Sequence, residues 1–148
     1  FYEGGIFNGY FVIGENASTI DTLAAIDISN SMPGGIVDST KWDSEIAYVS
    51  TQNLISIGNP CNNSVTAELL GNSTDCVQGF YPGEGKIISL QHKDTGNLAL
   101  IVAGYSGTDT RLAGRVIAHR LEELKEMGGC VITVEGSTPN DAEINNKK

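Results

Sequence analysis

Three segments of the chain share one pattern of hydrophobic and polar positions. In each, a short apolar run ends in glycine, a polar turn follows, and apolar residues then recur at helical spacing. The segments are residues 10–28, 53–71 and 98–118, with Gly14, Gly58 and Gly104 at the ends of the apolar runs. These glycines lie 44 and 46 residues apart. A repeated β-Gly-turn-α unit predicts a single Rossmann-like α/β domain with a largely parallel sheet.

The remaining patterns add strands around these units. Residues 86–92 alternate between apolar and polar and precede a turn signal, which predicts an antiparallel hairpin with the strand that follows. Residues 46–49 and 130–134 predict two further strands. We expect the α/β domain to cover residues 1–136. The remaining residues, 137–148, form a polar C-terminal tail that is loose unless it docks.

Two helices raise questions about individual side chains. Ser18 and Asp21 have the spacing of a capping box and predict a helix that begins near Thr19. Asp27 in that helix and Arg120 in the third helix both fall on apolar stripes. A buried charge needs a partner or a path to water. Either the two residues pair, or each extends to solvent or to a neighbouring subunit.

The composition narrows the class of protein. The 148 residues carry 9 basic and 18 acidic side chains, a net charge of −9. Such a surface repels phosphate backbones and argues against nucleic-acid partners. The longest apolar run, residues 98–103, is far shorter than a membrane span. Asn, Ser and Thr account for 35 residues, and the sequence begins with Phe1 rather than Met. These features favour an extracellular protein, either processed or excised from a longer chain.

The three cysteines indicate whether the protein resides in an oxidising or a reducing compartment. Cys61 and Cys76 flank one short segment, and a bridge between them would close a loop of about 15 residues. Such a bridge contributes about 3 kcal/mol in the chain-entropy account. The alternative is two free thiols in a reducing compartment. Cys130 opens an apolar strand pattern, which predicts a buried thiol, although an unpaired cysteine in a secreted protein can also join subunits.

The third glycine turn has the layout of a catalytic loop without its residues. Gly104 to Thr110 lacks the lysine of a phosphate loop and places Asp109 where a phosphate would lie. Ser106 resembles a hydrolase nucleophile, but Thr108 replaces the glycine that the motif requires. The downstream histidine, His119, is about 20 Å along the same helix at 1.5 Å per residue. We therefore predict that the protein is not an enzyme.

No metal or cofactor motif is present in the sequence. Two histidines and three cysteines have no ligand spacing, so we expect no cofactor, although acidic groups could hold Ca²⁺ on the surface. Three sequons make Asn16, Asn62 and Asn72 candidate glycosylation sites. Two of them also stand at predicted helix starts, where Asn and Ser commonly cap the helix.

Three stretches of sequence carry a family resemblance. They are FVIGENASTIDTLAAIDIS, LISIGNPCNNSVTAELLGNSTDC and ALIVAGYSGTDTRLAGRVIAH, which together extend over most of the region from Tyr10 to Gly136. In this order they resemble the archaeal surface-layer (S-layer) proteins and related archaeal cell-surface proteins. The resemblance implies an extracellular, often glycosylated structural protein that assembles with copies of itself, and it favours the Cys61–Cys76 bridge.

The sequence thus leads to one expected function and two alternatives. We expect a secreted structural subunit of an archaeal cell-surface assembly, either a lattice or a filament. S-layer subunits are usually several-fold longer, so an isolated surface domain is equally compatible. The first alternative is a module that binds a small molecule or cell-wall glycan at the strand ends near Gly14, Gly58 and Gly104. The second is a hydrolase that uses Ser106.

Overall fold

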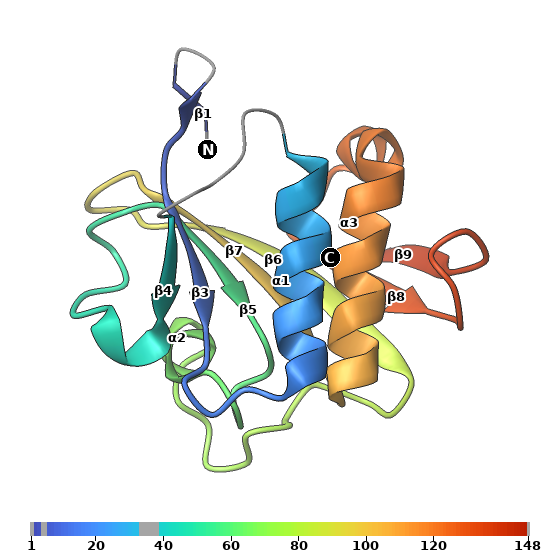
Figure 1. The fold of residues 1–148 in the computed structure, drawn as a ribbon, viewed down its shortest axis with the longest axis horizontal. Coiled ribbons are helices and arrows are strands. Elements are labelled where there is room, and N and C mark those ends of the chain that lie inside the picture. Colours follow the sequence, from blue (N-terminus) through green and yellow to red (C-terminus); the bar gives the residue numbers. More distant parts are fainter. Residues whose placement is uncertain (1, 4–5, 33–38, 148) are drawn as a thin grey trace.

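One mixed sheet organises the molecule (Figure 1). The computed structural model describes residues 2–3, 6–32 and 39–147. Seven strands lie in the order β4-β3-β5-β7-β6-β8-β9. Their bounds are Thr40–Trp42 (β4), Tyr10–Ile13 (β3), Leu54–Ile57 (β5), Leu98–Gly104 (β7), Glu84–Gln91 (β6), Val131–Glu135 (β8) and Glu143–Lys147 (β9). A separate two-stranded antiparallel pair joins β1 (Tyr2–Glu3) to β2 (Ile6–Phe7).

Each of the three glycine units forms as the pattern predicts. The helices are α1 (Thr19–Ser31), α2 (Ser64–Leu69) and α3 (Gly107–Met127). They follow β3, β5 and β7, and each begins at a capping side chain: Ser18, Asn63 or Ser106. The Ser18 hydroxyl accepts a hydrogen bond from the Asp21 amide, which confirms the predicted start of α1.

Two layers of helix enclose the parallel half of the sheet. Side chains alternate along each strand, so Phe11 and Ile13 belong to a core shared with α1 and α3, whereas Val12 packs with Val65 of α2 on the opposite face. Helices α1 and α3 lie side by side over the first face (Figure 1). Strands β4, β3, β5 and β7 are mutually parallel, which confirms the α/β class and the parallel centre of the sheet.

The other half of the sheet is antiparallel. Strand β6 pairs with β7 as the predicted hairpin, and β8 pairs with β6 along its other edge. The expected tail is docked, because β9 pairs with β8 from Val131↔Lys147 to Glu135↔Glu143. Ile144 of β9 packs against the core, which gives this otherwise polar strand an apolar anchor.

Several details of the prediction are wrong. Residues 46–49 form no strand; the chain instead forms β4 and then a short 3₁₀ helix, η1 (Asp43–Glu45). Ile46 and Val49 still pack against the core, which explains their apolar character without a strand. Cys130 is exposed rather than buried, because it follows two glycines and precedes the first residue of β8.

The two charges on apolar stripes do not pair with each other. The Arg111 Nε atom lies 3.2 Å from Asp27 Oδ2, so this ion pair joins α3 to α1. Arg120 instead pairs with Glu123 and donates to the carbonyl oxygens of Pro139 and Ala142 at 3.2 and 2.6 Å. The guanidinium of Arg120 therefore holds the chain between β8 and β9 against the third helix.

Candidate functional site at the carboxyl ends of the parallel strands

The turns that follow β3, β5 and β7 meet at one end of the sheet. This is the place where open α/β sheets bind ligands, in the crevice between strands whose helices lie on opposite faces. Here the helix after β3 covers one face and the helix after β5 covers the other. In this fold a ligand site is therefore expected in the crevice between β3 and β5.

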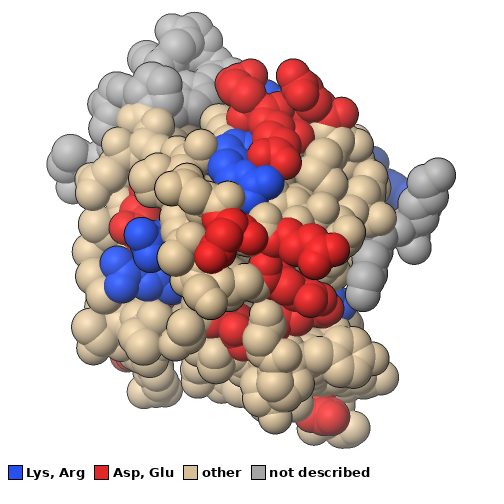
Figure 2. All heavy atoms as spheres, turned by 90° about the vertical axis from the view of Figure 1, so that its right-hand side faces the viewer, with Lys and Arg blue, Asp and Glu red and all other residues tan. Residues whose placement is uncertain are grey.

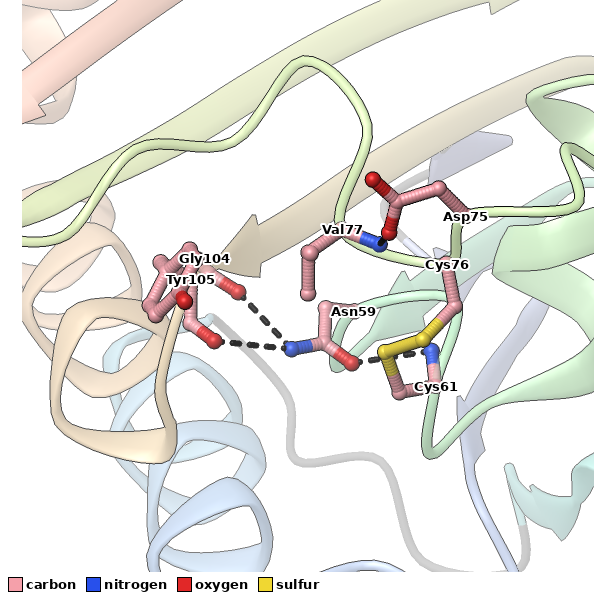
Figure 3. Close-up of a disulfide and its surroundings, with 7 residues drawn as sticks. All are labelled: Asn59, Cys61, Asp75, Cys76, Val77, Gly104 and Tyr105. Atoms are coloured by element: carbon pink, nitrogen blue, oxygen red, sulfur yellow. Dashed lines mark hydrogen bonds between the residues drawn. A yellow bond between two sulfur atoms is a disulfide. The ribbon is translucent and has the colours of Figure 1, made fainter.

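Asn59 joins two of these turns (Figure 3). Its buried side-chain amide donates to the carbonyl oxygens of Gly104 and Tyr105 at 3.0 and 3.1 Å. Its side-chain oxygen accepts from the Cys61 amide at 2.9 Å. All the groups that meet here are backbone peptides, so the side chain acts as a link between the β5 turn and the β7 turn.

Asn63 makes the corresponding link between the two central strands. Its amide donates to the carbonyl oxygens of Val12 in β3 and Ile57 in β5, at 3.2 and 2.9 Å. Its side-chain oxygen accepts from the amides of Val65 and Thr66 and so caps α2. This asparagine is 1% exposed, and every one of its hydrogen bonds is directed at the protein itself.

Gly14 shows how tightly the crevice is filled. A Cβ atom built on this residue would lie 1.7 Å from the Asn62 carbonyl oxygen, so the β5 turn lies directly against the end of β3. A side chain at position 14 would displace that turn. The first glycine of the repeated pattern is thus required by a close backbone approach, and the backbone of Asn62 and Asn63 occupies the space next to the end of β3.

A disulfide fixes the same turn from its outer side. Cys61 and Cys76 are bonded, with their Cα atoms 5.0 Å apart, as the spacing led us to expect. In Figure 3 the bridge lies beside Asn59, and Asp75 accepts a hydrogen bond from the Val77 amide at 3.2 Å next to it. The bridge therefore connects the crevice turn to the exposed loop that runs from α2 toward β6.

Asp43 of η1 joins the turn after β3 to the start of α2, which together form the rim of the crevice. One carboxyl oxygen accepts from the amides of Glu15 and Ser44, and the other accepts from the amide and hydroxyl of Ser64, all between 2.8 and 3.0 Å. Burial raises the pKa of Asp43, but the hydrogen bonds from Ser64, Glu15 and Ser44 outweigh burial and lower it. Asp43 thus stabilises the rim in its ionised form.

Asp21 is a buried carboxyl group beneath the three turns. It is 1% exposed, and neither carboxyl oxygen has a direct hydrogen-bond partner among the described residues. Burial raises its pKa, although polar groups of Ser18, Asn62 and Thr110 act in the opposite direction. Asp21 Oδ2 would be 3.7 Å from a Cβ atom at Gly58, so the second glycine also faces this group. Asp21 is therefore a buried carboxyl group whose ionisation is disfavoured by its surroundings.

The residues considered for catalysis do not assemble. Ser106 caps α3: its hydroxyl accepts from the Asp109 amide and donates to the Asp109 carboxylate at 3.0 Å. His119 is exposed along α3, and His92 lies just after β6, at the opposite end of the hairpin from the turn that holds Ser106. Within the described ranges, no cluster of three or more His, Cys, Asp or Glu side chains is placed to hold a metal ion.

The three glycosylation candidates differ in accessibility. Asn16 and Asn72 are exposed. Asn62 is half-buried, and its side chain is directed toward Asp21 closely enough to affect the pKa of that residue. Asn62 therefore has a structural role in the crevice that a glycan would disturb.

Sequence reasoning singled out the glycine turns but missed Asn59, Asn63 and Asp43 as the groups that join them. The one signal available was the Gly-x-Pro-x-x-Asn turn, in which Asn63 stands at the start of α2. Compared with protein-family models and with curated proteins, the chain matches none of them. None of the helices described is both long and apolar enough to cross a membrane.

Proposed function

We propose that this protein is an extracellular structural domain that assembles with copies of itself. The observation that carries the proposal is the filled crevice. At the place where α/β sheets usually bind ligands, the side chains of Asn59 and Asn63 hydrogen-bond to the protein's own backbone. A disulfide fixes the turn that holds them. Such an arrangement favours a rigid scaffold over a site that must open to a ligand. We also propose that the parallel half of the sheet, with its helices, has a Rossmann-like arrangement; the term does not extend to the antiparallel half.

The ends of the sheet supply a route for assembly. Strands β4 and β9 are the outermost strands, and an outer strand offers backbone groups to another chain. Tracing the pairings across the sheet, β4 is parallel to β7 and β9 is antiparallel to it. If copies follow one another by translation, β9 of one copy would meet β4 of the next in antiparallel pairing. The contact joins two different edges, and with copies related by translation it repeats without closing and generates a filament.

The disulfide and the surface residues support an extracellular location. The disulfide is typical of an oxidising compartment, and the exposed Asn16 and Asn72 would accept glycans there. A net charge of −9 makes copies repel one another at low ionic strength, so Ca²⁺ or salt would favour assembly. The resemblance to S-layer proteins supports the same function: a secreted subunit of an archaeal cell-surface lattice or filament.

Electron microscopy of the purified native protein, with Ca²⁺ and with a chelator, tests the proposal. We expect regular filaments or sheets, with Ca²⁺ promoting them. Hydrogen exchange of assembled and dispersed material should then show new protection at residues 40–42 and 143–147. Monodisperse particles under every condition would contradict self-assembly. Assembly without added protection at either edge would contradict the strand-pairing route alone.

A further inference from the structure

A hollow of about 400 Å³ lies outside the filled crevice, along the first half of α3. Ile20 of α1 and Ser137 from the turn between β8 and β9 both line it. The floor comes from one face of α3, where the lining residues recur at helical spacing: Thr108, Arg111, Leu112 and Arg115. The hollow therefore combines two guanidinium groups, the carboxylate of Asp109, two hydroxyl groups and two aliphatic side chains.

One of the two guanidinium groups in this hollow has no partner in the described part of the protein. Arg111 gives its Nε–H to Asp27 and is paired through that atom. Arg115 makes no hydrogen bond or ion pair with any residue in the described part of the chain, although it is partly buried. Asp109 also lines the hollow, but its Oδ2 atom already accepts from Gly83 and twice from Ser106. These hydrogen bonds come from neutral groups and leave the negative charge of Asp109 in place, so the two arginines are balanced in number by Asp27 and Asp109. What the hollow offers a ligand is the guanidinium of Arg115, which no carboxylate of the described residues contacts.

The unpartnered guanidinium of Arg115 and the surrounding charge together select the kind of anion. Residues four apart on a helix place their Cβ atoms about 6 Å from each other, so Arg111 and Arg115 can both direct N–H groups at one small planar anion. The protein as a whole carries −9, and acidic side chains gather in clusters around a few basic ones on the face seen in Figure 2. A doubly charged phosphate is disfavoured by that field more than a singly charged carboxylate.

The rest of the lining favours a ligand larger than a bare carboxylate. The hydroxyls of Thr108 and Ser137 can each donate or accept a hydrogen bond, as the hydroxyls of a sugar ring require. Ile20, which is 38% exposed, and Leu112 offer apolar contact to the C–H face of such a ring. We propose that this hollow is a binding site for a carboxylate-bearing sugar, such as a uronic acid, with Arg115 as the principal carboxylate ligand.

This site would act independently of self-assembly. A uronic acid can be a free monosaccharide or the end of a glycan chain, and both present the same carboxylate and ring. The site would therefore let a scaffold domain hold an acidic surface glycan without opening its crevice.

NMR titration of the isotope-labelled chain with three small probes provides the test. The probes are D-glucuronate, D-glucose, which lacks the carboxylate, and acetate, which lacks the ring. We expect glucuronate to shift the Arg115 side-chain and Thr108 amide signals and to bind at least about tenfold more tightly than either other probe. A glucuronate-terminated disaccharide that binds more tightly than glucuronate would assign the site to glycan ends. Equal or weaker binding would assign it to the free sugar.

Matched variants locate the binding. R115Q should weaken glucuronate binding at least about tenfold, whereas K125Q, which removes the same charge from an exposed position farther along α3, should leave it within about twofold. Because Arg115 has no partner in the described structure, R115Q should retain the wild-type midpoint of unfolding. The proposal is overturned if glucuronate does not bind, if acetate binds equally well, or if K125Q loses as much affinity as R115Q.

Discussion

The side-chain amide of Asn59 lies 3.0 Å from the carbonyl oxygen of Gly104, 45 residues away, and holds the β5 turn against the β7 turn. Replacement by alanine removes two donated hydrogen bonds and one accepted bond, and it leaves buried peptide groups without partners. We expect N59A to lower the free energy of unfolding by about 2–4 kcal/mol. Urea denaturation measures the change, with N16A at an exposed position as the control. An equal effect of the two variants would contradict the linking role of Asn59.

The disulfide should contribute a comparable amount of stability. Its cysteines are 15 residues apart, so loop closure predicts a loss of about 3 kcal/mol when both are replaced by serine. Denaturation of the C61S/C76S double variant under oxidising conditions provides the measurement. C130S serves as the matched control because its thiol is exposed, and it should stay within about 0.5 kcal/mol of the wild type. Wild-type stability that does not respond to a reductant would contradict this expectation.

Burial of Asp21 should make stability fall as the pH rises. The pKa of Asp21 is raised above 3.8 in the folded state. At pH values between 3.8 and this higher native pKa, the native protein keeps a proton that the unfolded chain has lost. Unfolding there releases a proton, so acid favours the native state. Relative to D21N, the wild type should gain stability as the pH falls from about 7 to about 4. Paired urea titrations across this range give the difference, and a difference independent of pH would refute the assignment.

Asp43 should show the opposite dependence in a separate range. Hydrogen bonds lower the pKa of Asp43 despite its partial burial. Its contribution to the free energy of unfolding is therefore complete above pH 3.8, and it is lost as the pH falls below 3.8 through the native pKa. We expect D43N to cost about 1.5–3 kcal/mol at neutral pH, since its bonds are charge-assisted. D94N, at an exposed position, should have little effect. A loss in D43N that persists unchanged into acid would show that its charge is not responsible.

The sequence allowed the parallel core to be predicted because its signals are local. Gly14, Gly58 and Gly104 each end an apolar run and precede a capped helix, so strand, turn and helix could be recognised without knowledge of their neighbours. The hairpin of β6 and β7 was equally clear from alternation and a turn. In these elements the local sequence pattern favours the same secondary structure that the tertiary packing requires, so the pattern alone was sufficient to predict it.

Elements stabilised by distant partners were harder to predict. Strand β9, with the sequence Glu143-Ile-Asn-Asn-Lys147, has little apolar alternation and forms because the edge of β8 is available to it. The direction of the Asn59 and Asn63 amides depends on carbonyl groups 45 and 51 residues away. Asp21 has the spacing of a helix cap, and only the packing of three turns above it makes it a buried carboxyl group.

The position of the disulfide has a consequence for proteolysis. The segment that it encloses includes exposed residues 71–75, the kind of loop at which proteases cut. A single cleavage there would break the backbone but leave the two pieces joined through Cys61 and Cys76. The parts of the sheet before and after the cut would also remain bound by the β5–β7 ladder. A nicked molecule would therefore keep its place in an assembly and would be revealed only after reduction and denaturation.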